Sequence, residues 1–171
     1  VVADYRGYGA STGEPSFAGV IHDSHIIFKE VKRELHARQL NETLWIMGRS
    51  LGSMSALELA SRYGDQIRGI IIESGFISVA TIMRHLDVPI NSTVYEQINR
   101  ESVDMVRAVT VPVLIIHGEN DLLVPYQEAL DLFETIGSEK KELVTIPFGD
   151  HNTVMAVGFR QYFDAIERFT G

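Results

Sequence analysis

The stretch Leu44–Tyr63, LWIMGRSLGSMSALELASRY, decides the fold of this chain. Its first residues, Leu44–Met47, predict a buried strand, and the residues after the following turn predict an amphipathic helix. The turn places Ser50 between two glycines in the pattern G-x-S-x-G, which exposes a serine hydroxyl as a candidate nucleophile. We expect Gly48 and Gly52 to be required there, because a Cβ atom would collide with the neighbouring strand and helix.

A second G-x-S-x-G match, Gly9–Gly13, centres on Ser11. The residues that follow it, Glu14-Pro15-Ser16, begin no helix, and other residues separate it from the preceding apolar run. Glycine and proline in this density mark loops and turns. We therefore interpret the second match as a glycine-rich loop and choose Ser50 as the nucleophile.

The chain of 171 residues carries a net charge of −8 and no run of lysine or arginine. This acidic balance argues against a surface for nucleic acid or for an anionic membrane. The chain has no cysteine, so disulfides, thiolate catalysis and thiolate metal sites are excluded. No apolar run reaches transmembrane length and no signal-peptide pattern is seen, so we expect a cytoplasmic protein without a transmembrane segment. The sequence leaves the oligomeric state open.

Apolar runs and helical stripes alternate along the whole chain, which we interpret as a single domain over residues 1–171. The expected strands are Val1–Tyr5, Thr43–Met47, Ile67–Glu73, Val111–His117 and Glu142–Pro147. The expected helices run from Ser16 to about Arg38, from Ser50 to Tyr63, from Pro125 to Gly137 and over about Val154–Phe169. This alternation predicts an α/β fold with a mostly parallel sheet and helices on both faces.

One connection, Ser74–Thr110, is much longer than the others. It holds helical stretches around Ser78–Leu86 and Val94–Val109. A long connection near a catalytic edge can close over the site as a lid. An extra packing helix explains the same pattern, and the sequence leaves both interpretations open.

A serine nucleophile needs a general base, and the base needs an orienting carboxylate. Asp121 follows the strand Val111–His117, and His151 follows the last strand. The carboxyl ends of parallel strands gather at one edge of a sheet. We therefore expect Ser50, Asp121 and His151 to meet at that edge.

Two other carboxylates compete with Asp121 for the role of the acid. Asp150 is adjacent to His151 in sequence, where its side chain would normally point elsewhere. Glu119 lies earlier in the same turn as Asp121, and the sequence does not exclude it.

Four motifs together resemble the α/β-hydrolase-fold serine hydrolases. They are Asp4-Tyr5-Arg6-Gly7-Tyr8-Gly9, Gly48-Arg49-Ser50-Leu51-Gly52, His117-Gly118-Glu119-Asn120-Asp121 with Val124-Pro125, and Gly149-Asp150-His151-Asn152. The closest branch is similar to esterases, thioesterases and lysophospholipase-like enzymes, and it also resembles prolyl-oligopeptidase catalytic domains. The family order of nucleophile, acid and histidine agrees with the residues chosen above. The motifs span essentially the whole chain and say little about the substrate.

The resemblance implies a role for each site residue. Ser50 would attack an acyl carbonyl and form an acyl-enzyme, His151 would act as general base and then general acid, and Asp121 would hold the imidazole tautomer. The backbone N–H of Leu51 would supply one oxyanion donor. The implied substrate is a small-molecule acyl ester or thioester, with no metal or organic cofactor. A peptidase of the prolyl-oligopeptidase type and a non-catalytic binding module are the alternatives.

The resemblance also implies segments ahead of Val1. Relatives carry three further strands there, with a His-Gly-type loop that supplies a second oxyanion donor. We therefore expect this chain to be an amino-terminally truncated hydrolase with impaired catalysis. We expect the last four strands to pair with one another and Val1–Tyr5 to stand apart.

Overall fold

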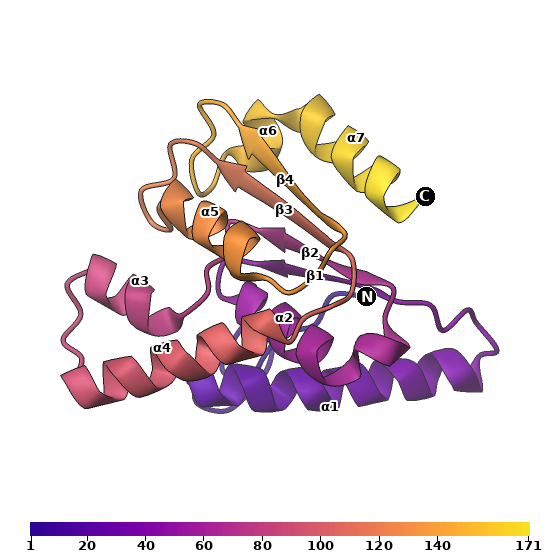
Figure 1. The fold of residues 1–171 in the computed structure, drawn as a ribbon. Coiled ribbons are helices and arrows are strands. Elements are labelled where there is room, and N and C mark those ends of the chain that lie inside the picture. Colours follow the sequence, from indigo (N-terminus) through magenta and orange to yellow (C-terminus); the bar gives the residue numbers. More distant parts are fainter. The chain divides into compact units, whose positions relative to one another are not determined.

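The computed structural model describes residues 1–171, and the chain falls into two compact units, residues 1–44 and 45–171. The single domain expected over residues 1–171 stays a prediction. The first unit holds helix α1 (Phe17–Ala37). The elements of the second unit, labelled in Figure 1, are β1 (Trp45–Arg49), α2 (Gly52–Tyr63), the short 3₁₀ helix η1 (Gly64–Gln66), β2 (Gly69–Glu73), α3 (Val79–His85), α4 (Ser92–Arg107), β3 (Val113–Gly118), α5 (Tyr126–Thr135), β4 (Lys141–Ile146), α6 (Val154–Val157) and α7 (Phe159–Thr170).

The strand predicted for Val1–Tyr5 is wrong, because these residues form neither a strand nor a helix. An extended segment becomes a strand only where a neighbouring strand satisfies its N–H and C=O groups. Apolar composition alone therefore does not fix a strand at this end of the chain. The second G-x-S-x-G match is a loop as predicted, and the Ser11 hydroxyl there donates to the Asp4 carbonyl at 3.1 Å.

Helix α1 begins where the sequence predicts. The Ser16 hydroxyl accepts a hydrogen bond from the Gly19 N–H at 2.9 Å, which satisfies one of the free donors of the first turn. One turn further on, the Asp23 carboxylate accepts hydrogen bonds from the Arg6 backbone N–H at 3.0 Å and from Arg6 Nε at 2.9 Å. Arg6 therefore ties the glycine-rich loop to α1 through both its backbone and its guanidinium.

The sheet of the second unit has four strands in the order β1-β2-β3-β4, all parallel, as Figure 1 shows. This confirms the predicted pairing of the last four strands, whose bounds differ from the prediction by one or two residues. Every residue of β2 and β3 is buried. Their near-continuous apolar runs are therefore explained by helices on both faces of the sheet.

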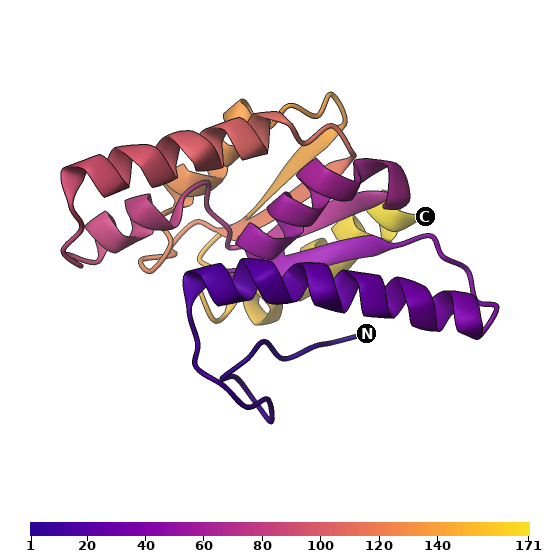
Figure 2. The same ribbon diagram turned by 90° about the horizontal axis from the view of Figure 1, so that it is seen from below.

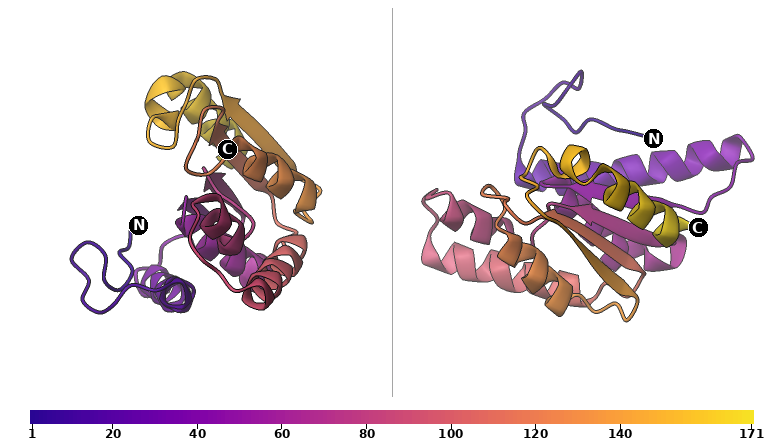
Figure 3. Two further views of the ribbon diagram at one scale, coloured as in Figure 1. Left: turned by 90° about the vertical axis from the view of Figure 1, so that its left-hand side faces the viewer. Right: turned by 90° about the horizontal axis from the view of Figure 1, so that it is seen from above.

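Helices of the second unit lie on both faces of its sheet. α2 and α4 lie side by side on one face (Figure 2), and α5 packs beside them against β3 and β4. α7 lies on the opposite face (Figure 3), where Tyr162 and Ala165 pack on Leu114, Ile116 and Ile146. Side chains alternate between faces along each strand, so neighbouring apolar residues serve both layers.

The single helix predicted over Val154–Phe169 is wrong, because Gly158 divides it into α6 and α7. A Cβ atom at Gly158 would lie 2.6 Å from the side chain of Ile146. The chain therefore turns at the one residue that can approach the end of β4 so closely.

The long connection between β2 and β3 carries α3 and α4. The Arg84 guanidinium lies 3.4 Å from the centre of the Tyr95 ring, which joins the two helices. The lid role proposed for this connection stays a prediction. No helix of the structure combines the length and the apolar character that crossing a membrane requires.

Because Arg6 and Asp23 pair, we expect the order of the loop at residues 4–16 to depend on pH. Hydrogen bonds from the Arg6 side chain and backbone hold the Asp23 pKa at about 2, below its usual value of 3.8. A carboxylate with a lowered pKa stabilises the fold fully above its unfolded pKa, and this contribution is lost as pH falls through the folded value. We expect amides of residues 4–16 to keep their protection from hydrogen exchange above pH 4 and to lose it towards pH 2.

The Asp23→Asn variant removes the carboxylate whose protonation causes this pH dependence. It should show weakly protected amides in residues 4–16 already at neutral pH. Glu30→Gln is the matched control, because Glu30 pairs with Arg33 on an exposed part of the same helix. Equal protection in the Asp23→Asn and Glu30→Gln variants would contradict the role of the Arg6–Asp23 pair.

Candidate active site

Ser50 occupies the turn between β1 and α2 with a φ of +51°, a left-handed conformation that side chains rarely adopt. Backbone hydrogen bonds hold it there. The Ser50 N–H donates to the Glu73 carbonyl at 2.9 Å, and the Ser50 carbonyl accepts from the Ser53 N–H at 2.9 Å and the Ser53 hydroxyl at 2.6 Å. The turn therefore presents the Ser50 side chain at the carboxyl end of the sheet.

The two glycines of the turn differ in what they allow. A Cβ atom at Gly48 would lie 2.3 Å from the Gly52 carbonyl oxygen and 2.9 Å from the Ala56 Cβ. A Cβ atom at Gly52 would meet nothing within 4 Å. The expected collision is therefore confirmed at Gly48 and wrong at Gly52, whose side-chain position faces open space.

His151 and Asp121 are brought together by the loops after β4 and β3. The Nδ1 atom of His151 lies 2.8 Å from Oδ2 of Asp121, whose side chain is fully buried. The other carboxylate oxygen accepts the backbone N–H groups of Leu123 at 3.0 Å and Val124 at 2.8 Å. Three donors thus satisfy one buried carboxylate.

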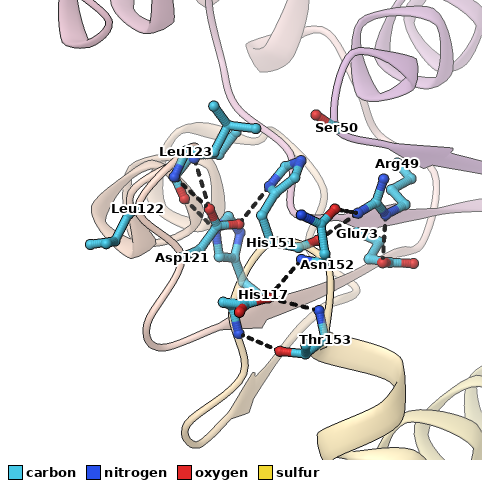
Figure 4. A network of polar contacts seen from close by, with 12 residues as sticks. Arg49, Ser50, Glu73, His117, Asp121, Leu122, Leu123, His151, Asn152 and Thr153 are labelled. Carbon is cyan, nitrogen blue, oxygen red and sulfur yellow. Dashed lines mark hydrogen bonds and ion pairs between the residues drawn. The ribbon is translucent and has the colours of Figure 1, made fainter.

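Ser50 lies across the His151 ring from Asp121 (Figure 4). Its hydroxyl forms no hydrogen bond with the ring, and contacts of this kind often tighten only when a substrate binds. The Leu51 N–H, at the start of α2, donates no backbone hydrogen bond. The amide that follows Ser50 in the sequence is thus unengaged.

The two competing carboxylates do not contact the ring. Asp150 Oδ1 accepts the N–H groups of Asn152 at 2.9 Å and Thr153 at 2.8 Å, and these bonds lower the Asp150 pKa. Asp150 therefore shapes the turn that carries His151. Glu119 is exposed and has no side-chain hydrogen bond. Of the three carboxylates weighed from the sequence, Asp121 is the one that contacts His151.

Sequence reasoning missed a polar network beside the turn, drawn in part in Figure 4. Arg49 Nε donates to Glu73 Oε1 at 3.1 Å, and Arg49 Nη2 donates to the His151 carbonyl at 2.5 Å. The Tyr162 hydroxyl donates to Glu73 Oε2 at 2.6 Å. Burial and this bond raise the Tyr162 pKa, so the phenol stays protonated. The sequence offered one signal, a glutamate at the end of the apolar run before Ser74, and the register that sets Glu73 opposite Arg49 is seen only in the folded sheet.

His117 also escaped assignment to the site. It is fully buried, its Nε2 donates to the Val124 carbonyl at 2.9 Å, and the same atom lies 3.5 Å from Asp121 Oδ2. Burial lowers the His117 pKa, which keeps the ring neutral. The ring therefore packs behind Asp121 as a neutral support for the acid loop.

Comparisons with known proteins agree with this geometry. The sequence profile of the prolyl oligopeptidase family matches residues 28–162. The chain is 32% identical over 151 residues to the uncharacterized protein YfhR of Escherichia coli, covering 86% of this chain and 51% of YfhR. It is 31% identical over 173 residues to protein bem46 of Schizosaccharomyces pombe, covering 98% of this chain and 56% of bem46. The chain thus spans little more than half the length of these curated relatives.

Solved structures share the fold at lower identity. The esterase Pf2001 of Pyrococcus furiosus superposes with a TM-score of 0.74 at 17% identity, covering 98% of this chain and 70% of that chain. The monoacylglycerol lipase of Paleococcus ferrophilus superposes with a TM-score of 0.70 at 15% identity, covering 98% and 81%. Both are α/β-hydrolases, which agrees with the fold predicted from the sequence.

The difference between the two glycines yields a prediction for stability. Gly48→Ala should lower the free energy of unfolding by about 1–3 kcal/mol, because the new methyl group overpacks against backbone atoms. Gly52→Ala should leave it unchanged or raise it by up to about 1 kcal/mol, because alanine favours the helix and meets open space. Urea denaturation of the two variants measures both changes. Equal destabilisation by the two substitutions would contradict the geometry of the turn.

Proposed function

Because this chain belongs to the prolyl oligopeptidase family and has the α/β-hydrolase fold, we propose that it is a serine hydrolase. The proposed reaction is the cleavage of a carboxylic ester or thioester through an acyl-enzyme on Ser50. The observation that carries the proposal is the 2.8 Å contact between His151 Nδ1 and the buried Asp121 carboxylate, with Ser50 across the ring. This is the relative placement that a nucleophile, its base and an orienting acid require.

The hydrogen bond to Asp121 decides the tautomer of the neutral His151 ring. A carboxylate only accepts, so Nδ1 carries the proton and Nε2 keeps a free lone pair on the side of Ser50. Nε2 takes the Ser50 proton as Oγ forms a bond to the acyl carbon. The Leu51 N–H then donates to the negative oxygen of the tetrahedral intermediate.

The remaining steps return the site to its starting state. The bond from the acyl carbon to the leaving oxygen or sulfur breaks, and the proton held on His151 Nε2 passes to the leaving group. A water molecule then gives a proton to Nε2 as its oxygen forms a bond to the acyl carbon. The bond from that carbon to Ser50 Oγ breaks, the proton passes from Nε2 to Oγ, and the acid leaves.

Two solved structures that share the fold support an ester substrate, since one is an esterase and the other a monoacylglycerol lipase. Each of the loops that carry the acid and the base also has an exposed apolar side chain. Leu122, next to Asp121, is 85% exposed, and Phe148, shortly before His151, is 79% exposed.

A peptidase is the second candidate, because the matching family profile is named for an oligopeptidase. The same three side chains cleave amides in other serine hydrolases, so the chemistry of the site does not separate the two. A comparison of substrates separates them. We expect p-nitrophenyl esters of graded chain length to be hydrolysed, and a proline-containing peptide p-nitroanilide to remain uncleaved. Cleavage of the anilide with no ester turnover would favour the peptidase.

Covalent labelling tests the nucleophile itself. Ser50→Ala should abolish labelling of the complete natural protein by a fluorophosphonate probe, because Oγ is the attacking atom. His151→Ala should reduce ester turnover nearly as much as Ser50→Ala, since the nucleophile and base act as a unit.

Ser11→Ala is the matched control, because it removes the serine of the other G-x-S-x-G match. The fluorophosphonate probe should label this variant to the same extent as the natural protein. Labelling that disappears in the Ser11→Ala variant and persists in Ser50→Ala would overturn the assignment. A natural protein that no fluorophosphonate labels would favour the non-catalytic binding module.

A further inference from the structure

Arg49 joins the two loops that carry the proposed nucleophile and base. It is the last residue of β1, directly before Ser50, and its Nη2 donates to the His151 carbonyl at 2.5 Å, across 102 residues of sequence. The same nitrogen lies 3.3 Å from the Asn152 side-chain oxygen. One guanidinium therefore contacts two successive residues of the base loop.

The other side of the guanidinium is fixed by a buried carboxylate. Glu73 is 6% exposed and accepts Arg49 Nε on one oxygen and the Tyr162 hydroxyl on the other. The Glu73 carbonyl accepts the Ser50 N–H at 2.9 Å. Glu73 thus holds the turn through its backbone and aims Arg49 through its side chain.

His151 is consequently held at two points. Its ring is held by Asp121, and its carbonyl is held by Arg49. Asp150 shapes the loop after β4 from within, because its carboxylate accepts the N–H groups of Asn152 and Thr153, and Arg49 adds a contact from this loop to the strand that ends beside Ser50. The two contacts together fix the direction in which Nε2 faces Ser50.

We propose that Arg49 is a positioning residue that ties the base loop to the nucleophile turn, an inference that rests on the proposed serine-hydrolase function. Glu73 and Tyr162 orient Arg49 and form no hydrogen bond with His151. The Arg49 side chain is 45% exposed, but the side chain of its partner Glu73 is 8% exposed, so the loss of Arg49 also removes the donor to a buried carboxylate oxygen. The test therefore compares the rate of the reaction with the free energy of unfolding, because positioning of His151 should lower the rate by more than the loss of stability explains.

The matched variants are Arg49→Ala, Arg49→Lys and Arg62→Ala. Arg62 pairs with Glu58 at 3.3 Å on α2, and its side chain is 69% exposed. Lysine at position 49 keeps the charge but lacks the planar fork that contacts Glu73 and the His151 carbonyl together. Arg49→Lys should therefore remain impaired, and Arg62→Ala should behave like the natural protein.

Kinetics on the complete natural protein give the first readout. We expect Arg49→Ala to lower kcat and the fluorophosphonate labelling rate by about 10²-fold with KM nearly unchanged, since a misplaced base slows the chemical step. Added methylguanidinium should restore part of the rate of Arg49→Ala, because it can occupy the space that the missing side chain leaves. An unchanged labelling rate, or an equal loss in Arg62→Ala, would overturn the proposal.

Hydrogen exchange gives a readout that does not depend on catalysis. Amides of residues 148–153 should exchange faster in Arg49→Ala than in the natural protein and in Arg62→Ala. If these amides exchange at an unchanged rate in Arg49→Ala, Arg49 does not hold the base loop, whatever the kinetics show. If the natural protein reacts with no fluorophosphonate, the hydrolase function and the catalytic part of the inference both fail, and faster exchange would leave Arg49 as a structural tether alone.

Discussion

The Asp121 carboxylate lies out of contact with water, and a buried carboxylate is tolerated only where donors replace its hydration. Two backbone N–H groups of its own loop and the His151 ring supply those donors. This requirement joins the loop after β3 to the loop after β4. It also decides which ring nitrogen of His151 faces Ser50. The chemistry proposed for the site depends on this one satisfied carboxylate.

The sheet makes that contact reachable. Parallel pairing of β1 to β4 brings all four carboxyl ends to one edge, and the turn at Ser50 stores a left-handed backbone conformation there. Such strain persists only where surrounding contacts hold it. The Glu73 carbonyl is one of those contacts, and its side chain belongs to the Arg49 network. The strained turn and the base loop are therefore parts of one hydrogen-bonded assembly.

Much of this arrangement could be predicted from local patterns. Apolar runs alternating with helical stripes predict four parallel strands, and Ser50, Asp121 and His151 each follow a strand end. What escaped prediction depends on partners distant in sequence. Glu73 ends an apolar strand, and its register opposite Arg49 arises only when the sheet forms. The break at Gly158 depends on the Ile146 side chain. The apolar pattern of Val1–Tyr5 predicts a strand, although no strand forms there.

The decisive measurement is a crystal structure of the complete natural protein after reaction with a fluorophosphonate. We expect phosphorus bonded to Ser50 Oγ, the phosphonyl oxygen accepting the Leu51 N–H, and the Asp121–His151 contact retained. An adduct on another residue would contradict this expectation. So would an adduct on Ser50 with the His151 ring turned away from Asp121.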